Sequence, residues 1–320
     1  MITLKEIDLA WQELPPDVVR TPVLRADALS EETSGTVLLK AENLQVTGSY
    51  KARASFTILN RLSDDEKRRG AAISSSGNFA AAFAHMGTRL GIPTTVVMMQ
   101  KTSPYKVERT RRFGAEVVLC ENRHESRWET LDRLKAERGI TVINTFEEPN
   151  VMRGHGTIGL EIMEHVPDVD VVLVPISSGG LIAGVATAVK EIRPSARVIG
   201  VQPEGSQAMY RSFRQGQVCG IDEARTICDA LIAGRPGVLP FEHVQRYVDD
   251  VVLVSDEQVK HAVRTLAGTT KLVVEPSGAV GIAAMQAGLV DVHGQTVVAL
   301  VSGGNIALAQ LAGILGEAEG

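Results

Sequence analysis

Residues 171–192 read VVLVPISSGGLIAGVATAVKEI, and this stretch decides the fold. It begins with a continuous apolar run, 171–176, which is the pattern of a strand buried on both faces of a parallel sheet. Two serines and two glycines follow, and the apolar residues after them take the spacing of a helix. A strand, a glycine loop and a helix in this order predict an α/β fold with helices on both faces of mostly parallel sheets.

The same alternation continues along the rest of the chain. The expected strands are 71–74, 94–99, 115–119, 141–146, 169–176, 197–201, 251–254 and 296–301. The expected helices are 79–90, 104–112, 124–138, 156–165, 181–192, 256–267 and 305–315. Sheets of this kind bind ligands in the loops after the carboxyl ends of their strands, so we expect function in those loops.

The composition indicates a large core and a small ligand. The chain has 320 residues, of which 44% are hydrophobic and 22% charged, which excludes disordered and fibrous classes. Its 33 basic and 38 acidic residues give a net charge of −5, and the basic residues are scattered. We therefore expect no nucleic-acid partner and no association with an anionic membrane surface.

The sequence also predicts a cytoplasmic location. No apolar run is long enough to span a bilayer, and residues 1–14 lack the basic and apolar regions of a signal peptide. The three cysteines, Cys120, Cys219 and Cys228, form no CxxC pair, which argues against disulfides and a zinc site. We expect them to be buried as small apolar residues.

Two polar stretches, 63–70 and 147–150, bracket a block with four expected strands and three expected helices. We therefore predict a small domain, residues 70–147, inserted into a large domain. The large domain is expected to consist of residues 1–69 and 148–320.

Three loops between a strand and a helix are rich in glycine and hydroxyl residues. They are Ser74–Phe79, Ser177–Leu181 and Ser302–Asn305. Free backbone N–H groups and a helix N-terminus make such a loop suited to a carboxylate or a phosphate. Ordinary helix caps and tight turns are the alternative interpretation. Neither GxGxxG nor GxxxxGK[ST] is present, so the dinucleotide and Walker fingerprints are excluded.

Lys51 is a fourth candidate for a functional role, besides the three loops. Ser49 is expected to cap a helix, which places Lys51 in the first turn, where the helix dipole disfavours a cation. A destabilised ammonium releases the neutral amine that forms a Schiff base. The alternative is a lysine that points to solvent.

Five motifs in this order and spacing resemble the fold-type II pyridoxal-phosphate (PLP) enzymes, and within them the serine/threonine dehydratase and serine racemase branch. The motifs are Gly48–Arg53, Ser76–Asn78, Ser177–Leu181, Val274–Ala279 and Ser302–Asn305. The similarity extends from Arg20 to Asn305. It implies two three-layer α/β/α domains, with the Ser-Gly-Asn loop in the small domain and the lysine and phosphate loop in the large domain.

The resemblance assigns roles to the cofactor-binding residues. Lys51 would hold PLP as a Schiff base and then move the substrate α-proton as a base. Tyr50, where the family usually has Phe, would lie against the pyridine ring, and Asn78 would bind the 3′-oxygen. The phosphate would be held by Ser177, Ser178, Gly179, Gly180 and Leu181.

The resemblance also assigns the substrate-binding residues and a second catalytic residue. The substrate carboxylate would be held by Ser75, Ser76, Gly77, Asn78 and Phe79. Ser76 would act as the acid/base on the face opposite the lysine. Ser302 would face the pyridine nitrogen without holding it protonated, which favours β-elimination over transamination.

Four departures from the family pattern affect the expected substrate more than the reaction type. Phe79 replaces a histidine, and Ser177 and Ser178 replace two glycines of a tetraglycine loop. The segment Cys228–Ala230 replaces Ala-Asp-Gly. Gln202 and Ala208 stand where cation-binding members carry carboxylates, so we expect no metal site.

The resemblance implies a PLP-dependent ammonia-lyase, a threonine/serine dehydratase type that converts a β-hydroxy amino acid to a 2-oxo acid and ammonia. A racemase or a β-replacement synthase is the alternative among enzymes, and a PLP-binding protein that has lost catalysis is the alternative outside them. The resemblance further implies a homodimer. Because the chain ends soon after Ser302, it implies no C-terminal regulatory domain.

Overall fold

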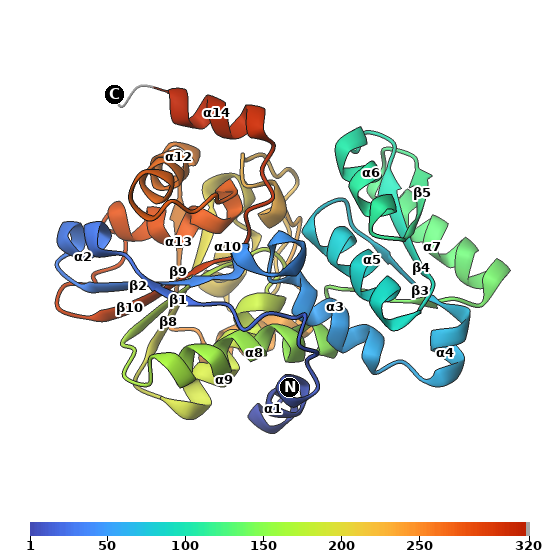
Figure 1. Cartoon of the computed structure of the whole chain (residues 1–320), viewed down its shortest axis with the longest axis horizontal. Coiled ribbons are helices and arrows are strands. Elements are labelled where there is room, and N and C mark those ends of the chain that lie inside the picture. Colours follow the sequence, from blue (N-terminus) through green and yellow to red (C-terminus); the bar gives the residue numbers. More distant parts are fainter. Residues whose placement is uncertain (318–320) are drawn as a thin grey trace.

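The computed structural model describes residues 1–317 and shows an α/β protein built on two separate sheets (Figure 1). The larger sheet has the order β1-β2-β10-β7-β8-β9, and the smaller has the order β5-β4-β3-β6. Among the described residues, every strand pairing is parallel except that of β1 with β2. The predicted fold class is therefore confirmed.

The strands have the following bounds. The larger sheet contains β1 (Val23–Arg25), β2 (Thr36–Ala41), β7 (Val171–Pro175), β8 (Arg197–Pro203), β9 (Asp250–Val254) and β10 (Thr296–Val301). The smaller sheet contains β3 (Ala71–Ser74), β4 (Thr94–Met99), β5 (Glu116–Cys120) and β6 (Thr141–Val142).

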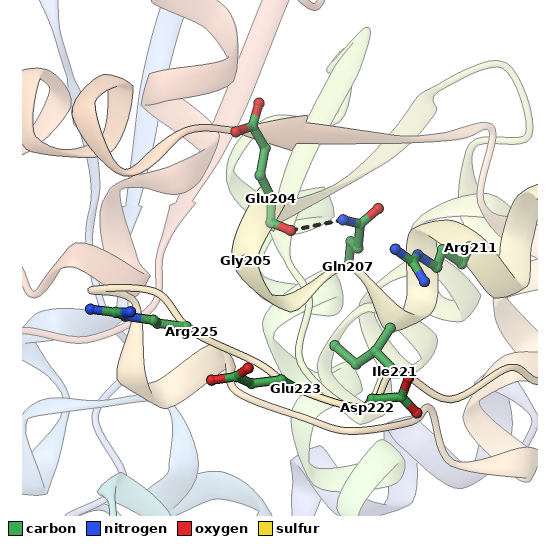
Figure 2. Close-up of a pocket in the computed structure, with 8 residues that line it drawn as sticks. All are labelled: Glu204, Gly205, Gln207, Arg211, Ile221, Asp222, Glu223 and Arg225. Atoms are coloured by element: carbon green, nitrogen blue, oxygen red, sulfur yellow. Dashed lines mark hydrogen bonds between the residues drawn. The ribbon is translucent and has the colours of Figure 1, made fainter.

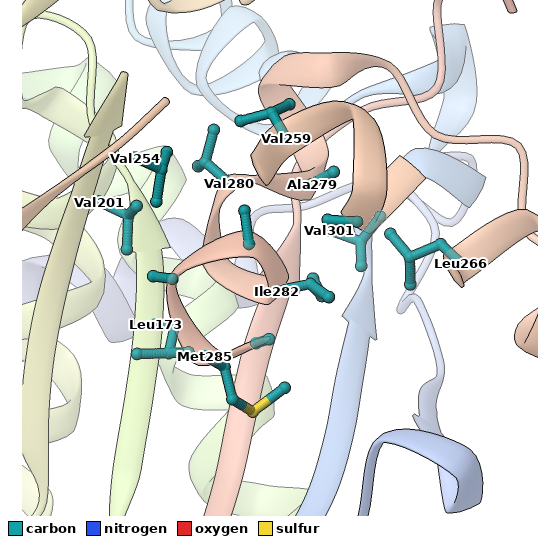
Figure 3. Close-up of a cluster of buried hydrophobic side chains, with 14 of the residues drawn as sticks. Leu173, Val201, Val254, Val259, Leu266, Ala279, Val280, Ile282, Met285 and Val301 are labelled. Atoms are coloured by element: carbon teal, nitrogen blue, oxygen red, sulfur yellow. The ribbon is translucent and has the colours of Figure 1, made fainter. Parts of the chain in front are cut away.

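The larger sheet is buried on both faces, as its continuous apolar strands require. Alternate residues of β7 point to opposite faces: Leu173 belongs to one core cluster and Val172 to the other. The helices α2 (Asp27–Thr33), α12 (Asp256–Thr265) and α13 (Pro276–Gln286) contribute to the first core, and Figure 3 shows Val280 of α13 on the side of the strand residues Val254 and Val201. The second core includes side chains of α8 (Pro149–His165), α9 (Gly180–Ile192) and α11 (Val238–Tyr247).

The smaller sheet has the same three layers. Ile73 of β3 shares a core with α5 (Asn78–Leu90) and α6 (Pro104–Arg112), whereas Ala72 shares the opposite core with α7 (His124–Arg138). All four of its strands fall within residues 70–147. The division of the chain into two domains at those boundaries stays a prediction.

All eight strands expected from the sequence are present, but β1 and β2 were missed. β1 has three residues, and β2 carries Lys40 in its apolar run. The expected strand 141–146 ends at Val142 because Asn144 begins a turn, in which its Oδ1 accepts from the Phe146 N–H at 3.1 Å.

Two expected helix starts were wrong. α8 begins at Pro149, inside the polar stretch 147–150 and before the expected start at 156, because proline suits the first helical position and Glu148 accepts a hydrogen bond from the Asn150 N–H at 3.0 Å. α14 (Leu308–Gly316) begins three residues late because the Asn305 side chain is bound elsewhere. The helices not expected in advance are α1 (Leu4–Gln12), α2, α4 (Asp64–Arg69), α10 (Ala208–Gln215), α11 and α13.

Two smaller expectations also have outcomes. The three cysteines are free, and Cys120 and Cys228 are buried, but Cys219 is partly exposed, contrary to expectation. Within residues 1–317, no helix combines the length and the apolar character needed to cross a bilayer.

The helix α3 (Lys51–Asn60) lies between the two sheets and packs against α5 and α8. Its position is fixed by a fully buried ionic cluster, which we call the Arg53 cluster and which consists of Lys40, Glu42, Arg53 and Glu161. Arg53 donates to both carboxylates at 2.7–3.0 Å, and Lys40 donates to Glu161 at 2.6 Å. The cluster joins β2, α3 and α8, and it lies two residues along the chain from Lys51.

We predict that Arg53→Met lowers the free energy of unfolding by about 3–5 kcal/mol, because two buried carboxylates would then share one cation. Denaturant unfolding measures the change. The matched control is Arg61→Met, at the end of the same helix, whose 3.1 Å ion pair with Glu13 is partly exposed and should contribute no more than about 1 kcal/mol. Equal effects of the two substitutions would contradict the prediction.

Candidate active site

The lysine segment and the last glycine loop are joined through their backbones. The Tyr50 N–H donates to the Ser302 carbonyl at 3.2 Å, and the Gly304 N–H donates to the Gly48 carbonyl at 3.0 Å. Lys51 is the first residue of α3, as predicted, but the cap was wrong: Tyr50 occupies the N-cap position. The Ser49 hydroxyl is buried and has no hydrogen-bond partner within residues 1–317.

The Lys51 amine lies among aromatic rings. Its Nζ is 2.5 Å from the Tyr50 hydroxyl, 4.2 Å from the centre of the Tyr50 ring and 5.2 Å from that of Phe79. Withdrawal from water lowers the pKa of Lys51 to about 7, and the Glu275 carboxylate opposes this shift. Burial also raises the pKa of Tyr50. A large fraction of Lys51 is thus the neutral, nucleophilic amine near neutral pH.

A chain of hydrogen bonds connects the Ser-Gly-Asn loop to the last glycine loop. Asn305 Nδ2 donates to Asn78 Oδ1 at 2.8 Å, and Asn78 Nδ2 donates to Glu275 Oε1 at 2.7 Å. Arg109 in turn donates to Asn305 Oδ1 at 2.7 Å. Asn78 is therefore held in one orientation by Glu275, the N-cap residue of α13, and by Asn305 of the loop after β10, which Arg109 of α6 holds in turn.

Glu275 is a site residue to which the sequence assigned no role. It is 4% exposed, and burial raises the pKa of its carboxyl to about 7. It also limits the space beside it: a Cβ on Gly303 would clash with Glu275 Oε1. Glycine in the last loop thus lets the backbone approach this carboxyl closely.

His155 is a second residue that sequence reasoning missed. Its ring is fully buried, lies 4.6 Å from the Tyr50 ring and 6.4 Å from the Phe79 ring, and has no hydrogen-bond partner at either nitrogen within residues 1–317. Burial lowers its pKa well below the usual value. The sequence signal was weak: His155 stands between Gly154 and Gly156. In the structure these two glycines let α8 approach Ala54 of α3 and Gly184 of α9 closely.

The loop Ser177–Leu181 connects β7 to α9 and lies near the lysine. Leu181 and Tyr50 belong to the same core cluster. Gly179 has φ +107°, a conformation that favours glycine, and a Cβ there would lie 2.5 Å from Met209 Cε. Ser177 and Ser178 are partly exposed, and Gly180 starts the helix. The loop therefore offers hydroxyls and a helix N-terminus next to Lys51.

The remaining predicted residues surround the same region. Ser302 is 3% exposed, and its hydroxyl donates only a long bond, 3.4 Å, to the Ser277 carbonyl. Ser76 accepts a hydrogen bond from the Thr102 hydroxyl at 3.2 Å. Ser75 accepts from the Gly77 N–H at 3.4 Å, and Phe79 lies in the first turn of α5.

The segment that the resemblance compares with a cation site is filled by an amide here. Gln202 is fully buried, and its Oε1 accepts the Tyr210 N–H at 2.8 Å. Ala208 begins α10. The nearby surface pocket, about 390 Å³, contains Glu204, Asp222 and Glu223, but Figure 2 shows their carboxylates pointing in different directions. No set of three or more metal-ligating side chains is found in the described chain. The predicted absence of a metal stays a prediction.

Comparisons with known proteins agree with this geometry. The family model described as pyridoxal-phosphate dependent enzyme matches residues 14–303. The L-threonine ammonia-lyase of Thermotoga maritima is 42% identical over 306 residues, which cover 96% of this chain and 76% of that protein. The catabolic L-threonine dehydratase of Staphylococcus aureus is 38% identical over 98% of this chain and 92% of its own length. The structure of maize serine racemase has a TM-score of 0.93 and 33% identity, and covers 97% of this chain and 95% of its own.

The chain belongs to the pyridoxal-phosphate dependent enzymes. Its cofactor is pyridoxal 5′-phosphate, and the resemblance to the serine/threonine dehydratase and serine racemase branch is confirmed. The residues present fit this cofactor. The Lys51 amine lies over the Tyr50 ring, and the His155 ring, whose nitrogens have no partner within residues 1–317, lies 4.6 Å from the same ring. The glycine loop at the N-terminus of α9 lies beside His155.

We predict that Lys51 in the cofactor-free protein reacts with an acetylating reagent with a midpoint near pH 7, because the neutral amine dominates above its pKa. A free lysine amine has a pKa of about 10.4. Competitive labelling between pH 5 and 10, followed by mass spectrometry of the Lys51 peptide, measures the midpoint. Glu275→Gln removes the negative charge that raises the pKa of Lys51, and it should therefore move the midpoint to lower pH. A midpoint near pH 10 in the chain without this substitution would contradict the assignment.

Proposed function

We propose that this enzyme is an ammonia-lyase that converts a β-hydroxy amino acid of the threonine or serine type to a 2-oxo acid and ammonia. The observation that carries the proposal is the Lys51 amine, with a pKa of about 7, held between the Tyr50 and Phe79 rings. The names of the similar L-threonine ammonia-lyase and L-threonine dehydratase support the reaction and the substrate.

The cofactor, when bound through its aldehyde to Lys51, supplies an electron sink for the pair left at the substrate α-carbon. Lys51 has two tasks: it holds the cofactor, and once displaced by the substrate amine it takes the α-proton. Both tasks need a neutral amine, and burial of Nζ away from water favours that form because it lowers the pKa of Lys51.

The other residues hold the cofactor and orient the substrate. Tyr50 would lie against the pyridine ring, and Asn78, oriented by Glu275 and Asn305, would bind the 3′-oxygen. The loop Ser177–Leu181 would bind the phosphate. Ser302 would face the pyridine nitrogen with a neutral hydroxyl, which favours elimination over transamination.

The loop Ser75–Phe79 would bind the substrate carboxylate. Ser76 would act as the acid for the leaving hydroxyl: because its oxygen accepts the Thr102 hydrogen bond, its own proton is free to be donated. A racemase would use the same Ser76 proton to reprotonate the α-carbon on the face opposite Lys51. The structural similarity to maize serine racemase favours this second candidate function.

We further propose that the enzyme is a cytoplasmic homodimer, with a small amino acid as its substrate. The support is the resemblance to the branch together with the finding that no helix of the described residues could cross a bilayer. Sedimentation of the cofactor-bound protein at several concentrations tests the dimer.

We predict that L-threonine yields 2-oxobutanoate and ammonia in equal amounts. Lys51→Ala should abolish measurable turnover, and Ser76→Ala should lower it by about 10²–10⁴-fold, the range for loss of one general acid. The matched control is Ser212→Ala on α10, which removes a serine hydroxyl bonded to the Ala208 carbonyl and no group from the site.

The products separate the alternatives. Chiral chromatography that shows D-amino acid as the main product would favour the racemase, and product formation only with an added nucleophile would favour a β-replacement synthase. A protein that binds the cofactor at Lys51 and converts none of these substrates would be the decayed binding protein.

We predict that chelation leaves activity and melting temperature unchanged, because the Gln202 amide and Ala208 replace the carboxylates that a Mg²⁺ or Ca²⁺ site needs. Turnover and thermal unfolding in EDTA, and again after adding Mg²⁺ in excess, measure this. A reversible loss in chelator would contradict the prediction.

A further inference from the structure

A second pocket, about 300 Å³ in volume, opens beside the loop Ser75–Phe79, and the reaction proposed above does not use its charges. Ser76 belongs to both the loop and the pocket. The other polar residues that line the pocket come from the segment after β4, from α6 and from α7: Lys101, Thr102, Ser103, Lys106 and Arg127.

The charges in this pocket are all positive. Lys101, Lys106 and Arg127 line it, and no acidic residue does. Lys106 pairs with Asp229 at 2.5 Å, so its charge is balanced by the chain itself. Within residues 1–317, neither Lys101 nor Arg127 forms an ion pair.

Arg127 gives the most specific signal. Its Nε is buried and has no hydrogen-bond partner among the described residues, and withdrawal from water lowers its pKa. A buried guanidinium N–H is normally paired, because an unpaired donor loses its hydration without compensation. Arg153, Arg193 and Arg264 also have an unpartnered buried Nε, but each forms an ion pair with a carboxylate, whereas Arg127 forms none among the described residues. For Arg127, in a cationic pocket, the missing partner is therefore expected to be an anion from outside the chain.

The backbone beside Arg127 favours an anion as well. Ser103 is the N-cap of α6, but its hydroxyl accepts no hydrogen bond from that helix. The N-terminus of α6 thus adds a partial positive charge and a free hydroxyl to the side chains of Lys101 and Arg127.

We propose that this pocket binds an anionic group on the side chain of the substrate, so that the enzyme prefers β-hydroxy amino acids with a side-chain carboxylate, such as 3-hydroxyaspartate, to threonine. This inference rests on the proposed function, in which the loop Ser75–Phe79 holds the α-carboxylate. Because Ser76 belongs both to this loop and to the pocket that Arg127 lines, a substrate held by the loop would have the pocket beside it for its β-substituent. The methyl group of threonine would desolvate the cations there and pair with neither.

The reaction on this substrate balances without any co-reactant other than water. Lys51 removes the α-proton, the Cβ–O bond breaks, and the hydroxyl leaves as water with the proton of Ser76. The unsaturated amine that results takes up water at the former α-carbon and releases ammonia. The organic product is oxaloacetate, and no atom is oxidised or reduced by an outside reagent.

The decisive measurement is kcat/KM for 3-hydroxyaspartate and for threonine in the cofactor-bound enzyme. We expect kcat/KM to be higher for 3-hydroxyaspartate than for threonine. Arg127→Met should lower kcat/KM for 3-hydroxyaspartate about ten- to a hundredfold, the range for one lost charge-assisted hydrogen bond. The same substitution should change kcat/KM for threonine by less than about threefold. Arg127→Lys should restore part of the loss, because it keeps the charge without the planar fork.

The control is Arg133→Met, on the same helix, where Arg133 is 54% exposed and pairs with Glu137. This substitution should leave kcat/KM unchanged for both substrates. O-phosphothreonine is a third substrate in the comparison, and its preference over 3-hydroxyaspartate would overturn the carboxylate assignment. A preference for threonine, or an equal effect of Arg127→Met on both substrates, would overturn the inference and leave the proposed function intact.

If the enzyme converts no β-hydroxy amino acid, the proposed function is contradicted, but the inference about the pocket is not. A binding experiment tests the pocket in that case. Succinate and butanoate have the same number of carbons and differ by one carboxylate. Succinate should raise the melting temperature of the cofactor-bound enzyme more than butanoate does, and Arg127→Met should remove the difference. Equal stabilisation by the two acids would overturn the inference.

Discussion

The site depends on the Arg53 cluster, because this cluster decides where α3 begins. Four fully buried charges lose their hydration, and the loss is offset only when Arg53 reaches Glu42 and Glu161 together. The packing of β2, α3 and α8 in this structure meets that condition. We infer that the cluster contributes more to a unique structure than to stability, and that it carries the backbone of Lys51 into position two residues away.

The same arrangement sets the chemistry of the lysine. Since the start of α3 is bonded to the loop after β10, the amine lies between two aromatic rings and next to one buried carboxyl. Few groups remain to stabilise an ammonium, so its pKa falls to about 7. The fold thus supplies a base without a histidine as proton acceptor, because His155, whose ring lies 4.6 Å from the Tyr50 ring, is itself held neutral by burial.

The parts predicted from sequence are those specified by residues close together in the chain. Apolar runs gave eight strands, and glycine with serine gave three loops, because both signals are local. β2 was missed since the charge of Lys40 interrupts an apolar run, and only the fold reveals that Glu161 pairs with it. Glu275 acquires its role through Asn78, 197 positions away, a contact that no local pattern contains. The resemblance supplied residue roles that spacing alone left open.

The proposed site has two kinds of surroundings. Near Lys51 the side chains are aromatic and the amine is largely neutral, whereas the pocket beside Ser76 carries Lys101 and Arg127, which form no ion pair within residues 1–317. On the proposed function and the proposed pocket, an amino acid with two carboxylates would place one at the Ser-Gly-Asn loop and the other at Arg127, with its α-amino group at Lys51. In the reversed orientation the two carboxylates would still meet the two anion sites, but the α-amino group would lie away from Lys51. The lysine would then select the orientation of the substrate, and the pocket would select the charge of its side chain.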